Sequence, residues 1–363
     1  MSGNSIGHLV KLTSWGESHG TAIGGVLDGL PPNISLDINK IQHALDLRRP
    51  GTDKILTSPR NEPDQIEILS GLFEGKTLGT PLAFIIQNKD HRSTDYDPYK
   101  NLYRPGHADY TYHKKYGHVD YRGGGRASAR ETAVRVAAGD IAKQILSQLL
   151  PDYTCQAAVI QIGDEKLTIP WDGKSYPANK LFCPDLHLVS KWTNYLTLIK
   201  EQGRSVGALI EVQARGIPAG LGEPVYDKLD ADIAKALMSI NAAKAVEIGD
   251  GFNTVTASTG FDEMTSENHF TSNKAGGILG GISSGQPIIC RVAFKPTSST
   301  QQPRQTIDKN GNNHTISITG RHDPCVGIRA VPIVEAMIHL TLLDHLLRWH
   351  GQCGGTNYAK ENS

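Results

Sequence analysis

The segment spanning residues 130–150 constrains the fold more than any other part of the chain. Its apolar residues recur at helical spacing and line one face: Val134, Ala138, Ile141, Ile145 and Leu149. Just before it, Ser128 and Glu131 form the S-x-x-E pattern of a capping box. We therefore predict a long amphipathic helix that begins close to Ser128.

Helical and strand patterns alternate along the rest of the chain without a clear linker. Spacing predicts helices at residues 37–49, 228–240 and 333–349, and strands at residues 66–73, 81–87, 206–215 and 288–294. In the segment 206–215 apolar residues recur at every second position, and Glu211, Gln213 and Arg215 lie between them, which predicts a strand with one wet face. Length alone suggests about two domains, but the intermingled elements favour one large mixed domain.

The composition excludes several classes of protein. Lys and Arg number 37, and Asp and Glu also number 37, which argues against a nucleic-acid binder that relies on a basic field but leaves local basic clusters open. The five cysteines are scattered without a C-x-x-C pair, which supports neither a zinc site nor a disulfide framework and fits a reducing cytoplasm. We see no apolar stretch of about 18 residues, so neither an export signal nor a membrane span is predicted.

The densest cluster of chemically useful residues lies at residues 104–135, RPGHADYTYHKKYGHVDYRGGGRASARETAVR. It contains three histidines, a run of three glycines and five arginines: His107, His113, His118, Gly123, Gly124, Gly125, Arg104, Arg122, Arg126, Arg130 and Arg135. Glycines let backbone N–H groups approach an anion, arginine offers a planar fork of donors, and imidazole titrates near neutral pH. The cluster predicts a site that binds an anionic small molecule and moves a proton.

Several blocks of the chain together resemble the chorismate synthase family. They are GESHG at residues 16–20 with RPGHADYTY from Arg104, RGGGRASARET from Arg122, INAAKAVEIGDGF from Ile240, FKPTSST from Phe294, and GRHDPCVGIRAVPIVEAM from Gly320. The resemblance implies an α+β fold, a β-α-β-α sandwich of mixed helices and antiparallel sheets in a single domain. That domain would span residues 1–350, with a polar tail at 351–363, and the protein would be a homotetramer.

The resemblance also implies a reaction. Chorismate synthases are lyases that remove phosphate and a C6 proton from 5-enolpyruvylshikimate 3-phosphate (EPSP) by an anti-1,4-elimination, the last common step of aromatic amino acid biosynthesis in the shikimate pathway. They require reduced FMN without net redox change. NADPH would reduce that flavin directly or through a separate flavin reductase; the absence of an appended domain favours a separate reductase.

Five residues match the family's catalytic positions, and each also has a simpler interpretation. His19 would meet the departing phosphate, and His107 would donate a proton toward the flavin; alone, each would be a structural histidine in a turn. Ser18, Ser128 and Asp344 would form a relay. Sequence alone makes Ser128 a helix N-cap worth roughly 1 kcal/mol, and Asp344 the partner of Arg348 on a solvated face.

The binding residues are also implied by the resemblance. Substrate anions would contact Arg48, Lys54, Arg104, Arg130 and Arg321, of which Arg48 also matches an NADPH position. Lys54 departs from the family's usual arginine and loses the bidentate fork, and Ala127 replaces a frequent serine. The flavin would contact Arg126, Ala127, Ser128, Asn241, Ala242, Gly280, Lys295, Pro296, Thr297, Ser298, Ser299 and Arg321. No residue is assigned to a metal.

Parts of the sequence also resemble two other classes of protein. The RGGGR run is similar to RNA-binding arginine-glycine tracts, but it occurs once, and an amphipathic helix follows it. A flavin-independent phosphate-binding transferase is the second alternative. Neither a Walker nor a strand-led Rossmann glycine pattern is present to support it.

Overall fold

The computed structural model describes residues 3–51, 62–90, 93–174, 178–256, 261–266, 269–318 and 323–354. Lys54 and Arg321, both predicted binding residues, lie outside the described residues, as does most of the predicted tail at 351–363.

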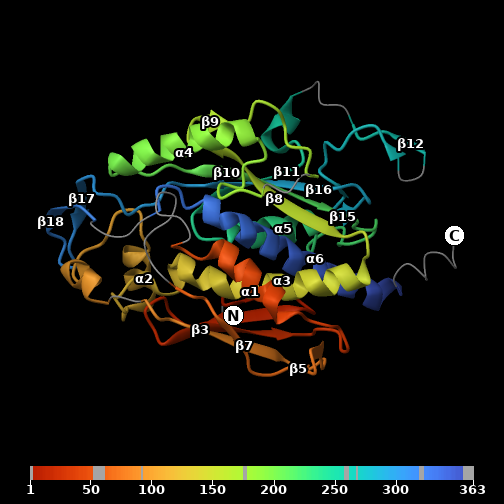
Figure 1. The fold of residues 1–363 in the computed structure, drawn as a ribbon, viewed down its shortest axis with the longest axis horizontal. Helices are drawn as coiled ribbons and strands as arrows, with labels where there is room; N and C mark the ends of the chain where they lie inside the picture. Colours follow the sequence, from red (N-terminus) through yellow and green to blue (C-terminus); the bar gives the residue numbers. More distant parts are fainter. Residues whose placement is uncertain are drawn as a thin grey trace.

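Two five-stranded antiparallel sheets form the frame of the molecule (Figure 1). The first has the order β1 (Ser5–Ile6), β2 (Lys11–Trp15), β3 (Ala22–Asp28), β7 (Leu82–Gln87) and β4 (Ile66–Ile68). The second has the order β11 (Ala243–Ile248), β16 (Ile288–Phe294), β10 (Ala208–Arg215), β8 (Thr154–Ile162) and β9 (Glu165–Lys166). Short hairpins pair β5 (Leu72–Phe73) with β6 (Lys76–Thr77), β12 (Met264–Ser266) with β13 (His269–Phe270), β14 (Ile278–Leu279) with β15 (Ile282–Ser283), and β17 (Arg304–Ile307) with β18 (Asn313–Ile316).

Helices fill the space between the sheets and cover the second sheet (Figure 1). The inner layer contains α1 (Ile38–Arg48), α3 (Thr132–Leu149), α5 (Leu229–Met238) and α6 (Val331–Cys353), while α4 (Leu186–Glu201) lies on the outer face of the second sheet. The expected β-α-β-α sandwich of mixed helices and antiparallel sheets is therefore confirmed. Two further pieces, η1 (Ser93–Tyr99) and α2 (Asp109–Tyr116), lie at one end of the layers.

Helices α3 and α6 pack closely because Gly139 faces Ala336. A Cβ on Gly139 would lie 2.3 Å from the Cβ of Ala336, closer than any real contact. The segment 328–353, which includes α6, is long and apolar enough to cross a membrane, contrary to our expectation that no apolar stretch reaches that length. Its apolar window is 89% buried inside the protein, so it has the burial of a core helix.

Two local predictions were wrong in detail. The predicted strand 66–73 is two strands, β4 and β5, separated by a turn at Gly71 (φ +79°). The supposedly wet face of β10 is buried: Glu211 pairs with Arg291, and Gln213 donates to the backbone carbonyl of Trp171. Interior strands of a sandwich with layers on both faces bury their polar residues as ion pairs and hydrogen bonds.

The capping box is only half formed. Ser128 accepts a hydrogen bond from the backbone N–H of Arg130 at 3.3 Å and caps a short 3₁₀ turn (Ala129–Glu131) that leads into α3. Glu131 does not bond back to Ser128 N; its carboxylate accepts from Ser14 Oγ and Arg135 Nε, both at 2.8 Å. Glu131 therefore anchors the helix start to strand β2.

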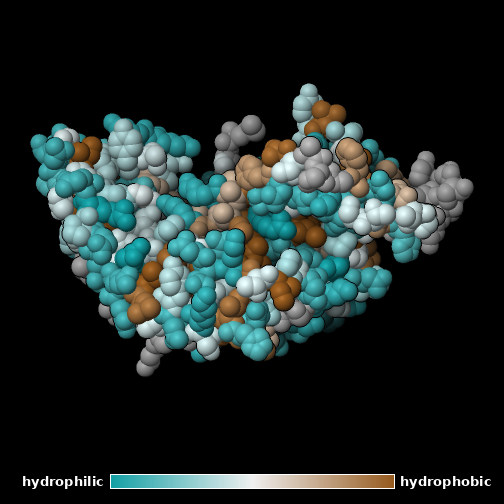
Figure 2. Space-filling view, turned by 90° about the horizontal axis from the view of Figure 1, so that it is seen from above, coloured by the Kyte–Doolittle hydropathy of each residue, from teal (hydrophilic) through white to brown (hydrophobic). Residues whose placement is uncertain are grey.

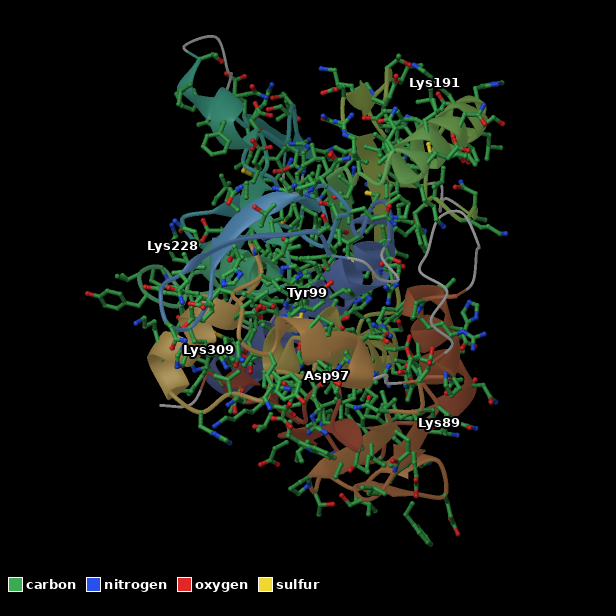
Figure 3. The ribbon with its side chains drawn as sticks, turned by 90° about the vertical axis from the view of Figure 1, so that its left-hand side faces the viewer. Lys89, Asp97, Tyr99, Lys191, Lys228 and Lys309 are labelled. Atoms are coloured by element: carbon green, nitrogen blue, oxygen red, sulfur yellow. The ribbon has the colours of Figure 1, made fainter. Side chains whose placement is uncertain are left out.

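The surface is mostly hydrophilic, with hydrophobic side chains scattered over the face seen in Figure 2. Figure 3 views the molecule from the end where η1 lies. Asp97 and Tyr99 of η1 lie there beside Lys309, which belongs to the turn between β17 and β18. All five cysteines are free thiols, and four of them are buried.

Candidate active site

The GESHG and RGGGR loops are in direct contact. Ser18 and His19 lie in a turn that is closed by a bond from Gly20 N to Glu17 O, and both side chains are buried. Gly123 has φ +75°, and a Cβ there would lie 2.2 Å from His19 Nδ1 and 2.8 Å from Ser18 Oγ. The first glycine of the run is therefore required by close approach to the histidine as well as by its backbone conformation.

Asn88, at the end of β7, connects the histidine turn to Arg130. Its amide NH₂ donates to Glu17 O at 3.1 Å and Gly20 O at 2.8 Å. Its carbonyl oxygen accepts from Arg130 Nε at 2.7 Å. One buried amide thus fixes the position of the His19 turn relative to a predicted substrate arginine.

Arg48 and Arg130 share one carboxylate. Asp64, fully buried, accepts from Arg130 Nη1 on one oxygen and from Arg48 Nη2 on the other. Burial by itself would raise the pKa of Asp64, but the charges of Arg48 and Arg130 lower it below its ordinary value. Burial lowers the pKa of Arg48 to about 10 against the opposing charge of Asp64, so both groups remain ionised at neutral pH.

Arg104 is also paired within the chain. Its guanidinium forms a fork with Asp109, with Nε and Nη2 each 2.8 Å from a carboxylate oxygen, and Nη2 also donates to Gly123 O at 3.1 Å. Tyr96 places its ring under this guanidinium, 5.3 Å from its carbon, and contacts the His19 ring edge to face at 4.9 Å. Tyr96 therefore joins two predicted site residues.

His107 is held as a neutral acceptor. Its Nδ1–H donates to Pro105 O at 3.1 Å, which leaves Nε2 to accept from Ser299 Oγ at 2.8 Å. Burial, with a smaller effect from the charge of Arg104, lowers the pKa of His107 to about 4. The imidazole is therefore uncharged at neutral pH, with Nε2 directed at a predicted flavin residue.

The predicted flavin segments from three parts of the chain lie together. Lys295 Nζ and Ser298 Oγ both donate to Gly106 O at 2.9 Å, and Lys295 N donates to Ala242 O at 3.0 Å. Asn241 Nδ2 in turn donates to Ala127 O at 2.8 Å. Among the described residues, the Lys295 ammonium forms no ion pair. Its pKa is lowered, mainly by burial and further by the charge of Lys244.

Not every predicted flavin residue joins this cluster. The Arg126 side chain is turned back to β2, where it donates to Ser14 Oγ at 2.6 Å, so only the backbone of that loop remains available. Gly280 lies in the β14–β15 turn, next to Gly281, whose carbonyl accepts from Leu229 N at the start of α5. Asn241 follows the other end of that ten-residue helix, which is about 15 Å long.

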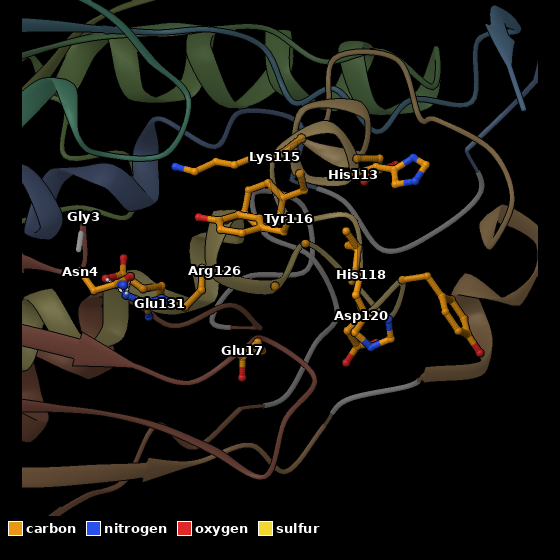
Figure 4. Close-up of a pocket in the computed structure, with 18 of the residues that line it drawn as sticks. Gly3, Asn4, Glu17, His113, Lys115, Tyr116, His118, Asp120, Arg126 and Glu131 are labelled. Carbon is orange, nitrogen blue, oxygen red and sulfur yellow. Dashed lines mark hydrogen bonds and ion pairs between the residues drawn. The ribbon is translucent and has the colours of Figure 1, made fainter. Parts of the chain in front are cut away.

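A cavity of about 900 Å³ borders the glycine run, and Figure 4 shows part of its lining. It lies between the N-terminal strands, α2 and the loop that leads to Arg126. Tyrosines and cations dominate its lining: Tyr99, Tyr103, Tyr112, Tyr116, Tyr121, Arg104, Arg126, Lys115, Lys235 and Lys309. His113 and His118, for which no role was predicted, line it too; His118 is exposed, whereas His113 is half-buried and bonds with Tyr103.

Asp344 occupies a different place from the other predicted catalytic residues. One of its oxygens accepts from three successive backbone N–H groups, of His8, Leu9 and Val10, at 2.7–3.0 Å. The carboxylate is 3% exposed, so the predicted solvated face is wrong; Arg348 lies 3.9 Å from the second oxygen. Asp344 lines a separate cavity of about 30 Å³.

Sequence reasoning missed four residues that hold the site together: Asp64, Asn88, Tyr96 and Asp323. Asp323 is buried and pairs with Arg329 at 2.7 Å, and its carbonyl accepts from Thr297 Oγ1 at 3.2 Å. Its position in GRHDPC, inside one of the family blocks, was the available signal. No periodicity marks the other three, since Asp64 and Asn88 lie just outside strands and Tyr96 lies in the short 3₁₀ helix η1.

Comparisons with known proteins identify the family of the chain. The chorismate synthase family model matches residues 10–347. The chorismate synthase of Paramagnetospirillum magneticum is 54% identical over 96% of this chain and 98% of its own. That of Methylobacillus flagellatus is 57% identical, over 97% of both chains. A crystal structure of chorismate synthase superposes with a TM-score of 0.73 at 31% identity and covers 98% of this chain and 96% of its own.

These matches extend over nearly the whole chain, as the sequence blocks predicted, and they do not favour the flavin-independent transferase. The chain belongs to the chorismate synthase family and is a lyase.

Proposed function

We propose that this lyase acts on EPSP with reduced FMN at the junction of the GESHG and RGGGR loops. The observation that carries the proposal is the contact of Gly123 with His19 and Ser18, because it joins two family blocks that lie about a hundred residues apart. EPSP carries two carboxylates and a phosphate, so its site needs several fixed cations. Arg48, Arg104 and Arg130 supply them, each held in place by an acidic partner.

Two histidines provide the proton transfers in this proposal. His19, buried beside Ser18 and packed against Tyr96, meets the leaving phosphate. His107 Nε2 faces the flavin side, next to Ser299. Neutral in the ligand-free protein, His107 gains affinity for a proton when anionic ligands bind nearby, since a negative charge favours the imidazolium form.

The residues present fit a flavin phosphate. Lys295 offers an ammonium that has no acid partner among the described residues, and Thr297, Ser298 and Ser299 offer hydroxyls. Asn241, Ala242 and the backbone of Ala127 adjoin this group. When bound, reduced FMN would supply a transient electron that helps phosphate to leave without net oxidation.

For the acid of the relay we favour Asp323 over Asp344. Asp344 is engaged by the N-terminal segment and lines another cavity, whereas Asp323 is buried against the predicted flavin residue Thr297. Arg329, the ion-pair partner of Asp323, donates to the backbone carbonyl of Arg48 at 2.8 Å, so Asp323 adjoins the substrate arginines as well. Ser18 and Ser128 remain candidates for the rest of the relay.

We further propose that the protein is a cytoplasmic homotetramer that receives reduced flavin from a separate reductase using NADPH. Gly280 lies about a helix length from Asn241, and a second copy of the chain that brings its own Gly280 to this site would account for the match of Gly280 to a flavin position. No domain that could bind NADPH by itself is visible among the described elements; Arg48, at the family's NADPH position, is buried.

The test is an anaerobic assay with EPSP and chemically reduced FMN, in which chorismate and phosphate are quantified. Equal yields of both products, dependent on reduction, support the proposal. A parallel assay with NADPH and FMN but no reductase tests the origin of the electrons. Turnover with NADPH alone would contradict the separate reductase.

A further inference from the structure

The pairing of Asp64 with two arginines suggests a role that goes beyond charge balance. Its carboxylate oxygens bind Arg48 and Arg130 separately, so one planar group sets the positions of two guanidiniums. These arginines come from different helical segments, α1 and the 3₁₀ turn before α3. A carboxylate shared in this way makes the orientation of one arginine depend on that of the other.

Asp64 itself is anchored by its backbone. The Gln42 side chain donates to Asp64 O at 3.3 Å and accepts from Ile66 N at 3.2 Å, which ties this segment to α1. Asp64 is also one of the few non-glycine residues with positive φ, at +49°. Such a conformation is strained for a residue with a side chain and persists where its surroundings fix it. The anchored backbone argues for a fixed support and against a carboxylate that swings away when substrate binds.

The hydrogen bonds of Arg48 leave a donor for a ligand. Its Nη2 binds Asp64, and Nη1 makes long bonds to Ala129 O and Thr132 Oγ1 at 3.3–3.4 Å. Its Nε is buried and has no hydrogen-bond partner among the residues that the structure describes. A buried guanidinium donor without an acceptor is costly, and an anionic ligand would satisfy it.

We propose that Asp64 is a positioning residue for substrate: it orients Arg48 and Arg130 together so that their remaining donors face the anions of EPSP. The inference rests on the proposed role of these arginines in substrate binding. Asp64 does not touch the reacting atoms, and it acts through both guanidiniums. Glu62, which accepts from Lys89 N at 3.1 Å and lies 3.9 Å from Arg130, supports the same group from the other side.

The primary test variant is Asp64→Glu, which keeps the charge but displaces the carboxylate by one methylene. We expect the KM for EPSP to rise by about tenfold or more, because charged hydrogen bonds that require fixed geometry are lost. The Kd for FMN should stay close to wild type, whereas the melting temperature should fall, because the same buried hydrogen bonds also stabilise the fold. Asp227→Glu is the matched control, because it makes the same change in a half-exposed pair with Arg348. An unchanged KM in Asp64→Glu would overturn the inference, as would equal losses of FMN and EPSP affinity.

A double-mutant cycle separates this inference from the role of the arginines. If Asp64 acts through Arg48, Asp64→Asn added to Arg48→Ala should cost much less kcat/KM than Asp64→Asn alone. Multiplicative losses would overturn the positioning role while leaving Arg48 as a substrate ligand. A wild-type KM in Arg48→Ala would contradict the proposed role of Arg48, and the inference with it. Should Asp64→Asn fail to fold, the Asp64→Glu result decides.

Discussion

Gly123 lies against the imidazole of His19 so closely that a Cβ at position 123 would overlap Nδ1, at 2.2 Å. The contact explains why a glycine stands there, and it places the glycine run beside a candidate catalytic histidine. The carbonyl of the same glycine accepts from Arg104, so one residue without a side chain contacts both a proton-transfer group and a cation.

This contact predicts the effect of Gly123→Ala. The new methyl group would displace His19 and Ser18, and we expect turnover to fall by about 10² or more, since misplacement of a reacting group by about 1 Å has that cost. Steady-state kinetics measure the loss. Gly117→Ala is the matched control: it has nearly the same φ, +72°, but nothing within 4 Å of its Cβ. Similar losses in both variants would mean that backbone strain, and not contact with His19, is responsible.

His107→Ala should lower turnover by a factor of about 10² to 10⁴, because it removes a proton-transfer group. FMN should still bind, since Lys295 and its neighbouring hydroxyls remain. Flavin titration followed by fluorescence checks this, and loss of flavin binding would indicate a structural role for His107 instead.

The ionisation of His107 can be measured separately. Burial and Arg104 lower its pKa to about 4 in the ligand-free protein, so NMR should find a neutral ring with Nδ1 protonated at pH 7. Because the folded pKa lies below the unfolded value of about 6.5, this group destabilises the fold as pH falls from 6.5 toward 4. Addition of EPSP or FMN should raise its pKa. A ligand-free pKa above 6.5 would contradict the assigned hydrogen bonds.

Asp344→Ala should reduce stability more than turnover. The change removes the acceptor for three backbone N–H groups of the N-terminal segment, and one buried unsatisfied group alone costs about 1–3 kcal/mol. Urea unfolding and kcat measured on the same preparation separate the two effects. A folded variant with normal stability and a large loss of kcat would restore Asp344 to the catalytic relay.

The buried carboxyl of Glu335 should give the stability of the protein a pH dependence opposite in sign to that of His107. Burial raises its pKa to about 7, although Lys143 and a bond from Ala157 N at 2.8 Å favour the charged form. The folded protein therefore binds this proton more tightly than the unfolded chain does. The stabilisation is complete below pH 4.5 and is lost as pH rises through 7, by about 3 kcal/mol.

The variant Glu335→Gln cannot ionise at this position, so it should not lose stability as pH rises. Its free energy of unfolding should therefore change less between pH 4.5 and 7 than that of the wild type. Denaturant titrations at several pH values measure it. Activity should be unaffected, since Glu335 lies between α6 and β8, away from the glycine run. An unchanged pH dependence would show that Glu335 is ionised in the folded protein.

The helices and strands that carry a clear hydrophobic period were predictable from the sequence. Residues 288–294 form β16 with the expected bounds, and the helix expected at 37–49 is α1, with Asp37 accepting from Asn39 N as its cap. The layer order came only from resemblance to the family, because periodicity does not specify which sheet a helix covers.

Prediction failed where tertiary contacts override local patterns. The local pattern predicts that Glu131 completes a capping box, but its carboxylate binds Ser14 on β2. The pattern also predicts that Asp344 is exposed, but the N-terminal segment covers it. Asp64 and Asn88 carry no local signal at all. Their importance arises from partners tens of residues away, Arg130 for both of them, which only the folded chain brings together.

The most direct test of the account is single-turnover formation of chorismate by the purified protein under anaerobic conditions. With EPSP and reduced FMN, we expect chorismate and phosphate in equal amounts, and with oxidised FMN neither product. No chorismate with reduced FMN, or phosphate release that is the same without flavin, would contradict the account.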